Sequence, residues 1–101
     1  MGDSLFRNVQ TLPAVTATQA PAAPARLGTS AIFSGGLLVQ ADPTNGGYVY
    51  VGATDVVTTT GVALAPGAAL SIDQNDPSCM AVCAGAVGYK VRVLGIGPKE
   101  T

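Results

Sequence analysis

From Gly28 onward the chain is a succession of short β-prone runs separated by glycine, proline, asparagine and aspartate. The clearest runs cover residues 37–41, 48–51, 70–73, 80–84 and 89–94, with a weaker one at 31–33. Five or six short strands at spacings of about 8–12 residues are typical of compact antiparallel folds. No helical periodicity competes with this pattern. We therefore predict an all-β fold, either a small antiparallel β-sandwich or a jelly-roll-like barrel.

Alternation within the runs predicts which way the side chains point. The positions expected to face the core are Leu70, Ile72, Val91 and Val93. Lys90 and Arg92 are expected to face water, and in residues 48–51 the two tyrosines share one side of the strand and the two valines the other. Residues 80–84 carry no charge on either side. This run is therefore expected to be a central strand.

The segments between the runs have the chemistry of tight turns. Residues 42–47 contain Pro43, which fixes φ, and Asn45 with two glycines, which accept positive φ. We expect this turn to join residues 37–41 and 48–51 in a hairpin. Residues 65–68 place Pro66 and Gly67 at the two central positions of a type II turn, and residues 75–78 form a further turn.

The N-terminal region has a different composition. Residues 12–26 contain three prolines, six alanines and no acidic residue, which excludes a helix interior or a central strand. We expect residues 1–27 to be an extended arm and residues 28–101 to be a β domain that folds without it. Two interpretations of the arm stay open. It is either an unstructured tail or linker, or a segment that becomes ordered by docking along a neighbouring subunit.

Charge is scarce, at 11% of the residues and a net charge of −1. The five cations are spread along the chain, so a nucleic-acid surface is not expected. A chain this neutral either exposes much small-residue surface or covers it by assembling. We favour assembly into a homo-oligomer, for example a trimer. No targeting segment or bilayer-spanning apolar run is visible, so synthesis in a cytosol and no membrane partner are expected.

The residues that could carry chemistry are few. The chain has no histidine, which removes the usual general base and the commonest metal ligand. Asp42, Asp55, Asp73 and Asp76 could in principle surround a hard cation, but no dense acidic motif appears and aspartate beside glycine, proline or asparagine normally serves turns. Ser71 and residues 58–60 have no base to activate them. We therefore expect no enzymatic activity, no cofactor and no metal site.

The two cysteines, Cys79 and Cys83, lie four positions apart in a region expected to be a strand. Their Cα atoms would then be about 13 Å apart, beyond the reach of a disulfide. A metal site would need two further soft ligands, which the chain lacks. The expectation is two buried free thiols that behave as small hydrophobic groups.

The string NGGYVYVGATDVVTTTGVALAPGAALSID, residues 45–73, carries a resemblance. It resembles the N-x-G-x-VYVG … V … G-x-x-L-x-PG-x-x-L signature of small virion proteins of tailed bacteriophages, in which an apolar strand, a glycine turn and a VRVL strand follow. The matching positions are Asn45, Gly47, Val49, Tyr50, Val51, Gly52, Val56, Gly61, Leu64, Pro66, Gly67 and residues 91–94. The resemblance covers roughly residues 36–95, and the chain departs from the pattern in its Pro/Ala-rich segment and its two cysteines. It implies a part of a virion more strongly than it implies which part.

The resemblance and the composition lead to three function classes. The first is a non-enzymatic capsid decoration or cement protein, made in the host cytoplasm and bound in the virion to the major capsid protein or other virion subunits. The second is an adhesive or fibre-base module of the head or tail, which would use the tyrosines or loop 53–63, because a tyrosine can stack on a sugar ring. An enzyme is the third and least supported class. The candidate partner-binding residues are Leu12, Pro13, Pro21, Pro24, Arg26, Tyr48 and Tyr50.

Overall fold

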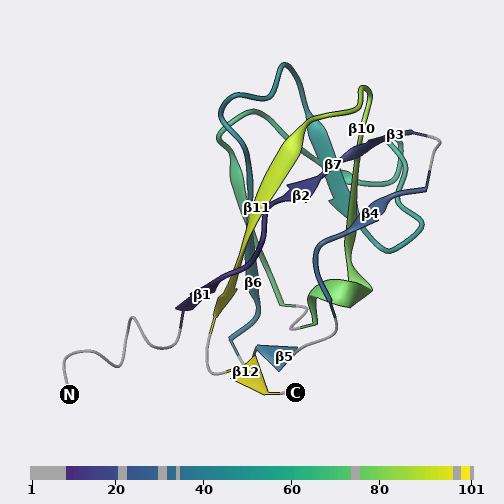
Figure 1. The fold of residues 1–101 in the computed structure, drawn as a ribbon. Helices are drawn as coiled ribbons and strands as arrows, with labels where there is room; N and C mark the ends of the chain where they lie inside the picture. Colours follow the sequence, from purple (N-terminus) through teal and green to yellow (C-terminus); the bar gives the residue numbers. More distant parts are fainter. Residues whose placement is uncertain are drawn as a thin grey trace.

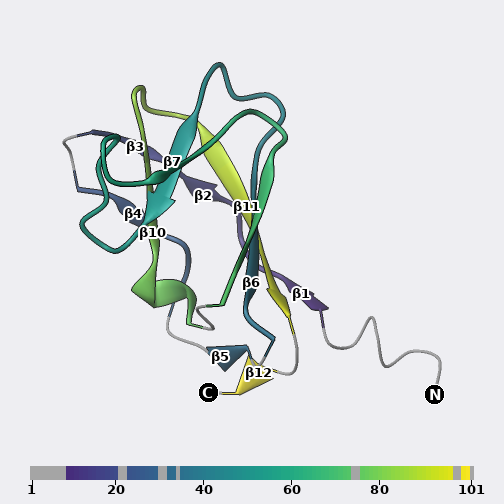
Figure 2. The same ribbon diagram turned by 180° about the vertical axis from the view of Figure 1, so that it is seen from behind.

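Two β-sheets pack face to face in the computed structural model of this protein, which describes residues 9–20, 23–29, 32–33, 35–73, 76–96 and 99–100 (Figures 1 and 2). The described residues contain no α-helix and a single 3-10 helix, η1 (Pro77–Cys79). The core between the sheets takes buried side chains from both of them. This arrangement confirms the predicted all-β class and is that of a small β-sandwich.

The first sheet is antiparallel and has β11 and β6 at its centre. Its strands are β1 (Val9–Thr11), β2 (Val15–Thr16), β11 (Lys90–Ile96), β6 (Leu37–Ala41) and β9 (Ala69–Ile72). Both β1 and β2 pair with one edge of β11, β6 pairs with its other edge, and β9 lies beyond β6.

The second sheet is built in the same way around β10 and β7. Its strands are β3 (Thr18–Gln19), β4 (Ala25–Arg26), β10 (Ala81–Ala84), β7 (Val49–Gly52) and β8 (Val62–Leu64). The short strands β3 and β4 share one edge of β10, with β3 parallel to it and β4 antiparallel. At one end of the sandwich, β5 (Ile32–Phe33) and β12 (Lys99–Glu100) form a separate two-stranded ladder (Figure 1).

The burial pattern follows the alternation in the sequence. Val91 and Val93 are buried, and Lys90 and Arg92, which alternate with them, are exposed. The two valines of β7 are buried, and Tyr50 is half-buried. Leu70 and Ile72 are half-buried and pack against the core. All four residues of β10 are buried, and the strand has a partner on both edges, which confirms its predicted central position.

The predicted hairpin between residues 37–41 and 48–51 is wrong. β6 pairs with β11 and β9, whereas β7 pairs with β10 and β8 in the other sheet. The turn after β6 therefore carries the chain from one sheet to the other. The strand positions were predictable because alternation reports which side chains are buried, but it does not report which strand is the neighbour.

The described part of the N-terminal region, residues 9–20 and 23–27, is extended, as expected, but it lies along this chain's own sheets and not away from them (Figures 1 and 2). Backbone hydrogen bonds run from Leu12 N to Val93 O (3.0 Å), from Ala17 N to Tyr89 O (2.7 Å) and from Leu27 N to Met80 O (3.0 Å). The side chains of Ala17 and Leu27 are fully buried in the core.

These contacts correct the expected division into an arm (residues 1–27) and an independent domain (residues 28–101). The segment crosses from the first sheet to the second at Ala17 and covers one edge of each. Its prolines that the structure describes, Pro13 and Pro24, lie between strands, where no ladder hydrogen bond is lost. A segment whose composition is typical of an unstructured tail therefore forms four short strands at the edges of the two sheets.

The predicted turn at residues 65–68 is confirmed. Gly67 has φ +86°, and Ala68 N donates to Ala65 O at 2.9 Å. Gly67 N also donates to Ala41 O, and Ala41 N donates to Ala68 O, both at 2.9 Å. Gly67 is thus the first residue of a G1-type bulge opposite Ala41, which sets the register of β9 on β6.

We expect Gly67→Ala to lower the free energy of unfolding by about 1–2 kcal/mol, because an L-residue at positive φ brings its Cβ too close to the backbone. Gly85→Ala is the matched control. At both glycines a Cβ would meet no atom within 4 Å, but only Gly67 has a positive φ. Denaturant midpoints of the two variants measure the difference, and equal midpoints would contradict this assignment of the turn.

Candidate interaction surface

The structure does not bring the seven predicted partner-binding residues together. Leu12 and Pro13 line an apolar groove of about 230 Å³, whose other walls are Ala14, Val15, Leu27, Gly28, Thr29 and Pro77. Pro24 is half-buried beside β4, and the exposed Arg26 donates from Nη1 to Ser78 O at 3.0 Å. Pro21 lies outside the described residues.

The two tyrosines differ in their surroundings. Tyr48 precedes β7 and is 55% exposed. Tyr50 lies on the outer side of the second sheet and packs with Val56 and Cys83 in a small cluster separate from the main core. Tyr50 is therefore largely a packing residue, and Tyr48 is the one of the pair that a partner could reach.

The outer face of the first sheet carries a hydrophobic hollow that was not predicted from the sequence. Leu38 of β6 and Leu94 of β11 are half-buried and directly opposite each other in the ladder. With Thr11, Gln40, Arg92 and Val93 they line a hollow of about 250 Å³. The alternation signal was present, because Leu38 stands between the buried Leu37 and Val39, and Leu94 between the buried Val93 and Gly95.

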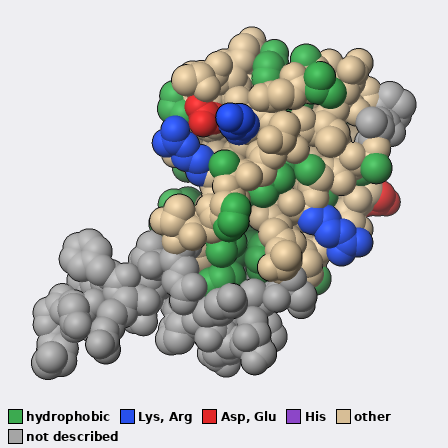
Figure 3. All heavy atoms as spheres, in the orientation of Figure 1, with side chains coloured by type: hydrophobic (Ala, Val, Ile, Leu, Met, Phe, Trp, Pro, Cys, Tyr) green, Lys and Arg blue, Asp and Glu red, His purple; other side chains and the backbone are tan. Residues whose placement is uncertain are grey.

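Of the residues that line this hollow, one, Arg92, is charged. On the face drawn in Figure 3, charged side chains are few, and most of the described surface is backbone, uncharged polar groups or hydrophobic side chains. The solvent-facing side of an antiparallel sheet is usually polar. A cross-strand leucine pair on that side is therefore a candidate interaction surface.

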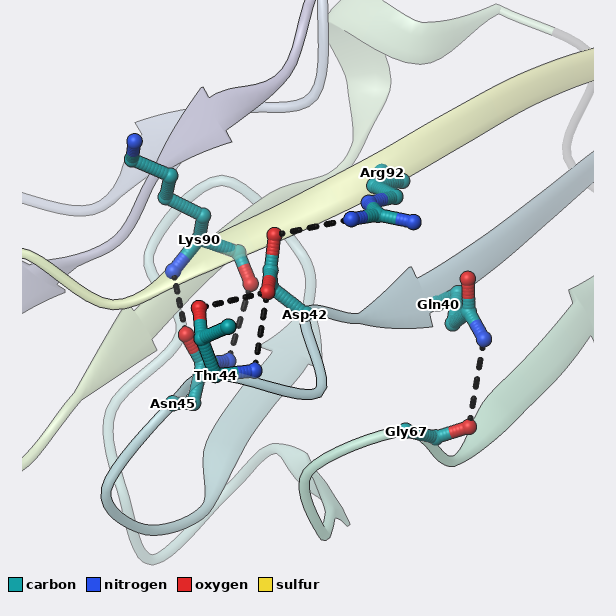
Figure 4. Close-up of polar contacts among 7 residues, drawn as sticks. All are labelled: Gln40, Asp42, Thr44, Asn45, Gly67, Lys90 and Arg92. Atoms are coloured by element: carbon teal, nitrogen blue, oxygen red, sulfur yellow. Dashed lines mark hydrogen bonds and ion pairs between the residues drawn. The ribbon is translucent and has the colours of Figure 1, made fainter.

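A polar network holds the neighbouring loop on β11 (Figure 4). Asn45 Nδ2 donates to Lys90 O at 2.9 Å, and Lys90 N donates to Asn45 Oδ1 at 2.8 Å. The side-chain amide of Asn45 therefore makes the same two hydrogen bonds to β11 that the backbone of a neighbouring strand would make. Asp42 Oδ1 accepts from Thr44 N (2.9 Å) and Thr44 Oγ1 (2.7 Å). Asp42 Oδ2 lies 3.4 Å from Arg92 Nη2. The network orients Arg92 at the rim of the hollow.

The hydrogen bonds from Thr44, with a smaller contribution from Arg92, hold the pKa of the Asp42 carboxyl below its ordinary value. A carboxyl whose pKa is lower in the folded state stabilises the fold above its unfolded pKa, and this contribution is lost as the pH falls. We therefore expect wild-type protein to lose stability below about pH 4 more steeply than Asp42→Asn. The measurement is the denaturation midpoint against pH, with Asp55→Asn, in an exposed loop, as the control expected to follow wild type. Identical profiles for wild type and Asp42→Asn would contradict this role.

The cysteines are both free, but only Cys83 is buried, so the expectation of two buried thiols holds for one of them. Cys79 is exposed because it ends η1 and does not belong to a strand. Asp76 caps this turn by accepting from Ser78 N (2.9 Å) and Ser78 Oγ (2.8 Å). Burial raises the pKa of the Cys83 thiol.

We expect a thiol reagent to modify Cys79 rapidly in the native protein and Cys83 only after unfolding, because the thiolate is the reactive form and must be accessible. Mass spectrometry of the labelled chain before and after addition of denaturant measures this. Cys79→Ser should abolish rapid labelling, and equal rates at both cysteines in native protein would contradict the placement of β10.

The other candidates from the sequence occupy separate places. Among the described residues, no three His, Cys, Asp or Glu side chains lie close enough together to hold a metal ion. Ser71 is exposed on β9, and Asp55 and residues 58–60 belong to the loop between β7 and β8. Within the part of the chain that the structure describes, no helix is both long and apolar enough to cross a membrane.

No family model matches this chain, and no match was found among the curated proteins or the solved structures. The positions that carry the resemblance to phage virion proteins have structural roles here. Asn45 pairs with β11, Val49 and Val51 fill the core, and Gly67 forms the bulge.

Proposed function

We propose that this protein is a non-enzymatic structural protein of a tailed-bacteriophage virion, a capsid decoration or cement protein that binds the head shell and stabilises it. The observation that carries the proposal is the hydrophobic hollow on the outer face of the first sheet, around Leu38 and Leu94. The sequence resemblance supplies the class of particle. The partner is the major capsid protein or another virion subunit.

The surface is suited to binding a protein partner. Leu38 and Leu94 offer apolar area that a partner can cover. The side chains of Arg92 and Gln40 offer hydrogen-bond donors, which fix the orientation of the partner. Both strands lie inside the sheet, so the side chains are held on a rigid support. Because the N-terminal segment is part of the sandwich, we place shell binding on this sheet face and no longer on an arm.

An adhesive or fibre-base module is the second candidate, and the exposure of Tyr48 is the observation that favours it. The copy number distinguishes the two. Mass-spectrometric quantification of this chain in purified particles of the phage that encodes it should give hundreds of copies per particle for a decoration protein. A handful of copies would replace that assignment with the vertex or tail module, and absence from the particles would contradict both.

The binding surface has its own test. We expect Leu38→Ser with Leu94→Ser to reduce the amount of protein that sediments with shells lacking it, because the apolar contact is lost. The control is Val62→Ser with Val87→Ser, which also removes two exposed apolar side chains. Equal retention of both double variants on the shells would show that the hollow is not the contact.

A further inference from the structure

The two sheets have unequal edges. On one side of the sandwich, β1 to β4 cover β11 and β10. On the other side the sheets end at β9 and β8, and among the described residues no strand pairs with the outer edge of either. An uncovered edge strand presents backbone donors and acceptors to any extended chain that can approach it.

The hydrogen-bond pattern identifies which backbone groups of β9 point outward. Ala41 N donates to Ala68 O, and opposite residues in an antiparallel ladder alternate between hydrogen-bonded and non-hydrogen-bonded pairs. Leu70 and Ile72, opposite Val39 and Leu37, are therefore bonded to β6. The N–H and C=O groups of the two intervening residues, Ala69 and Ser71, consequently face the open edge.

Two of the usual protections of an edge strand are missing from β9, although the strand is short and follows the Gly67 bulge. Its four residues, ALSI, include no charged residue and no proline. Ala69 and Ser71 are exposed and small, so no side chain blocks the approach of another strand. On the same side of the sandwich, β8 adds the exposed side chain of Val62 (53%).

We propose that β9 is a homodimerisation strand, which pairs with β9 of a second copy in antiparallel orientation around a two-fold axis at Leu70. In this register Ala69 of each copy faces Ser71 of the other, and both pairs exchange their N–H···O=C bonds. The register uses only residues of β9 and leaves its bonds to β6 intact. It joins the two first sheets into one continuous sheet.

A second copy is the occupant that the observations favour. The outward groups of Ala69 and Ser71 are symmetric about Leu70, so the strand is complementary to itself, as an isologous interface requires. The net charge of −1 gives little repulsion between copies. The pairing would also place two copies of the Leu38–Leu94 hollow on one sheet surface. The proposed oligomer is therefore a dimer and not a trimer, which was the example expected from the composition. The dimer does not depend on the proposed virion function.

Two double variants of the full chain test the register. In Ala69→Lys/Ser71→Lys the proposed pairing sets like charges directly opposite each other, which is destabilising. In Ala69→Lys/Ser71→Glu the same positions bring opposite charges together. Sedimentation across micromolar to millimolar concentrations should show a dimer for wild type and for the Lys/Glu variant, and a monomer for the Lys/Lys variant. Loss of the dimer in both variants, or in neither, would overturn the register.

Amide hydrogen exchange in the wild-type protein provides a test that needs no variant. At low concentration the amides of Leu70 and Ile72 should be protected, and those of Ala69 and Ser71 should exchange freely. At concentrations where the dimer forms, the amides of Ala69 and Ser71 should become protected as well. A wild-type protein that stays monomeric at every concentration, or an oligomer in which these two amides remain unprotected, would overturn the proposal.

Discussion

Deletion of residues 1–26 is expected to abolish the cooperative unfolding of this protein. The deletion removes β1 to β4 and with them the covering of one edge of each sheet. It uncovers the edges of β10 and β11, two strands with buried side chains, and empties the core position of Ala17. Far-UV circular dichroism and chemical denaturation would measure the loss. A truncated chain with an unchanged unfolding midpoint would show that the segment is a dispensable arm.

A matched pair of point variants separates packing from chain length. Ala17→Asp should destabilise the protein by about 3–5 kcal/mol, because an unpaired charge would be buried between the sheets. Ala14→Asp makes the same change three positions earlier, where the side chain is exposed, and should be nearly neutral. Denaturant midpoints measure both, and equal effects would mean that Ala17 is not in the core.

The second large effect is expected at Gly95, a buried position in the interior of β11. A Cβ added here would overlap ring atoms of Phe33, whose side chain is fully buried. A glycine within a strand often marks such a close approach. We therefore expect Gly95→Ala to cost about 2–3 kcal/mol, toward the upper end of the usual penalty for overpacking a core.

A double-mutant cycle tests this cause directly. Phe33→Leu removes the ring that the new methyl group would meet, so Gly95→Ala should cost less than half as much in that background as in wild type. The measurement is the free energy of unfolding of the four proteins in denaturant. An equal cost in both backgrounds would indicate that the penalty comes from the backbone of β11 and not from Phe33.

The elements that were predictable from the sequence are those fixed by local chemistry. β6 has the predicted bounds, the alternation in β11 separates Val91 and Val93 from Lys90 and Arg92, and the Pro-Gly pair forms its turn. Each of these depends on neighbours within a few residues. A strand that must bury one side, or a turn that needs positive φ, constrains its own sequence.

The features that were missed depend on contacts between distant residues. The partners of β6 are β9 and β11, both far along the chain, and nothing in residues 37–51 distinguishes these pairings from a hairpin. The N-terminal strands are held largely by backbone hydrogen bonds, such as Ala20 N to Ala84 O at 2.8 Å, which any residue except proline could make. Their alanines and prolines therefore give no signal of pairing, although Ala17 and Leu27 fill core positions.

The candidate surface was missed for a related reason. The residues chosen from the sequence belonged to the supposed arm or were tyrosines, whereas the hollow is formed when Leu38 and Leu94 are placed side by side by strand pairing. Each leucine alone is an ordinary β-strand residue. Only the register between β6 and β11 makes them a contiguous apolar surface on the side of the sheet that faces water.

Residues 9–20 and 23–27 belong to the sandwich, so the face of the first sheet and the β9 edge are the surfaces that we propose for partners. Amide hydrogen exchange at Leu12, Ala17, Ala20 and Leu27 tests it most directly, because each of these amides donates to a backbone carbonyl of the strands or turns around β10 and β11. We expect these amides to be protected about as strongly as the β6 amides in the same sample. Exchange of these four amides at the rate of an unstructured peptide, with β6 still protected, would contradict it.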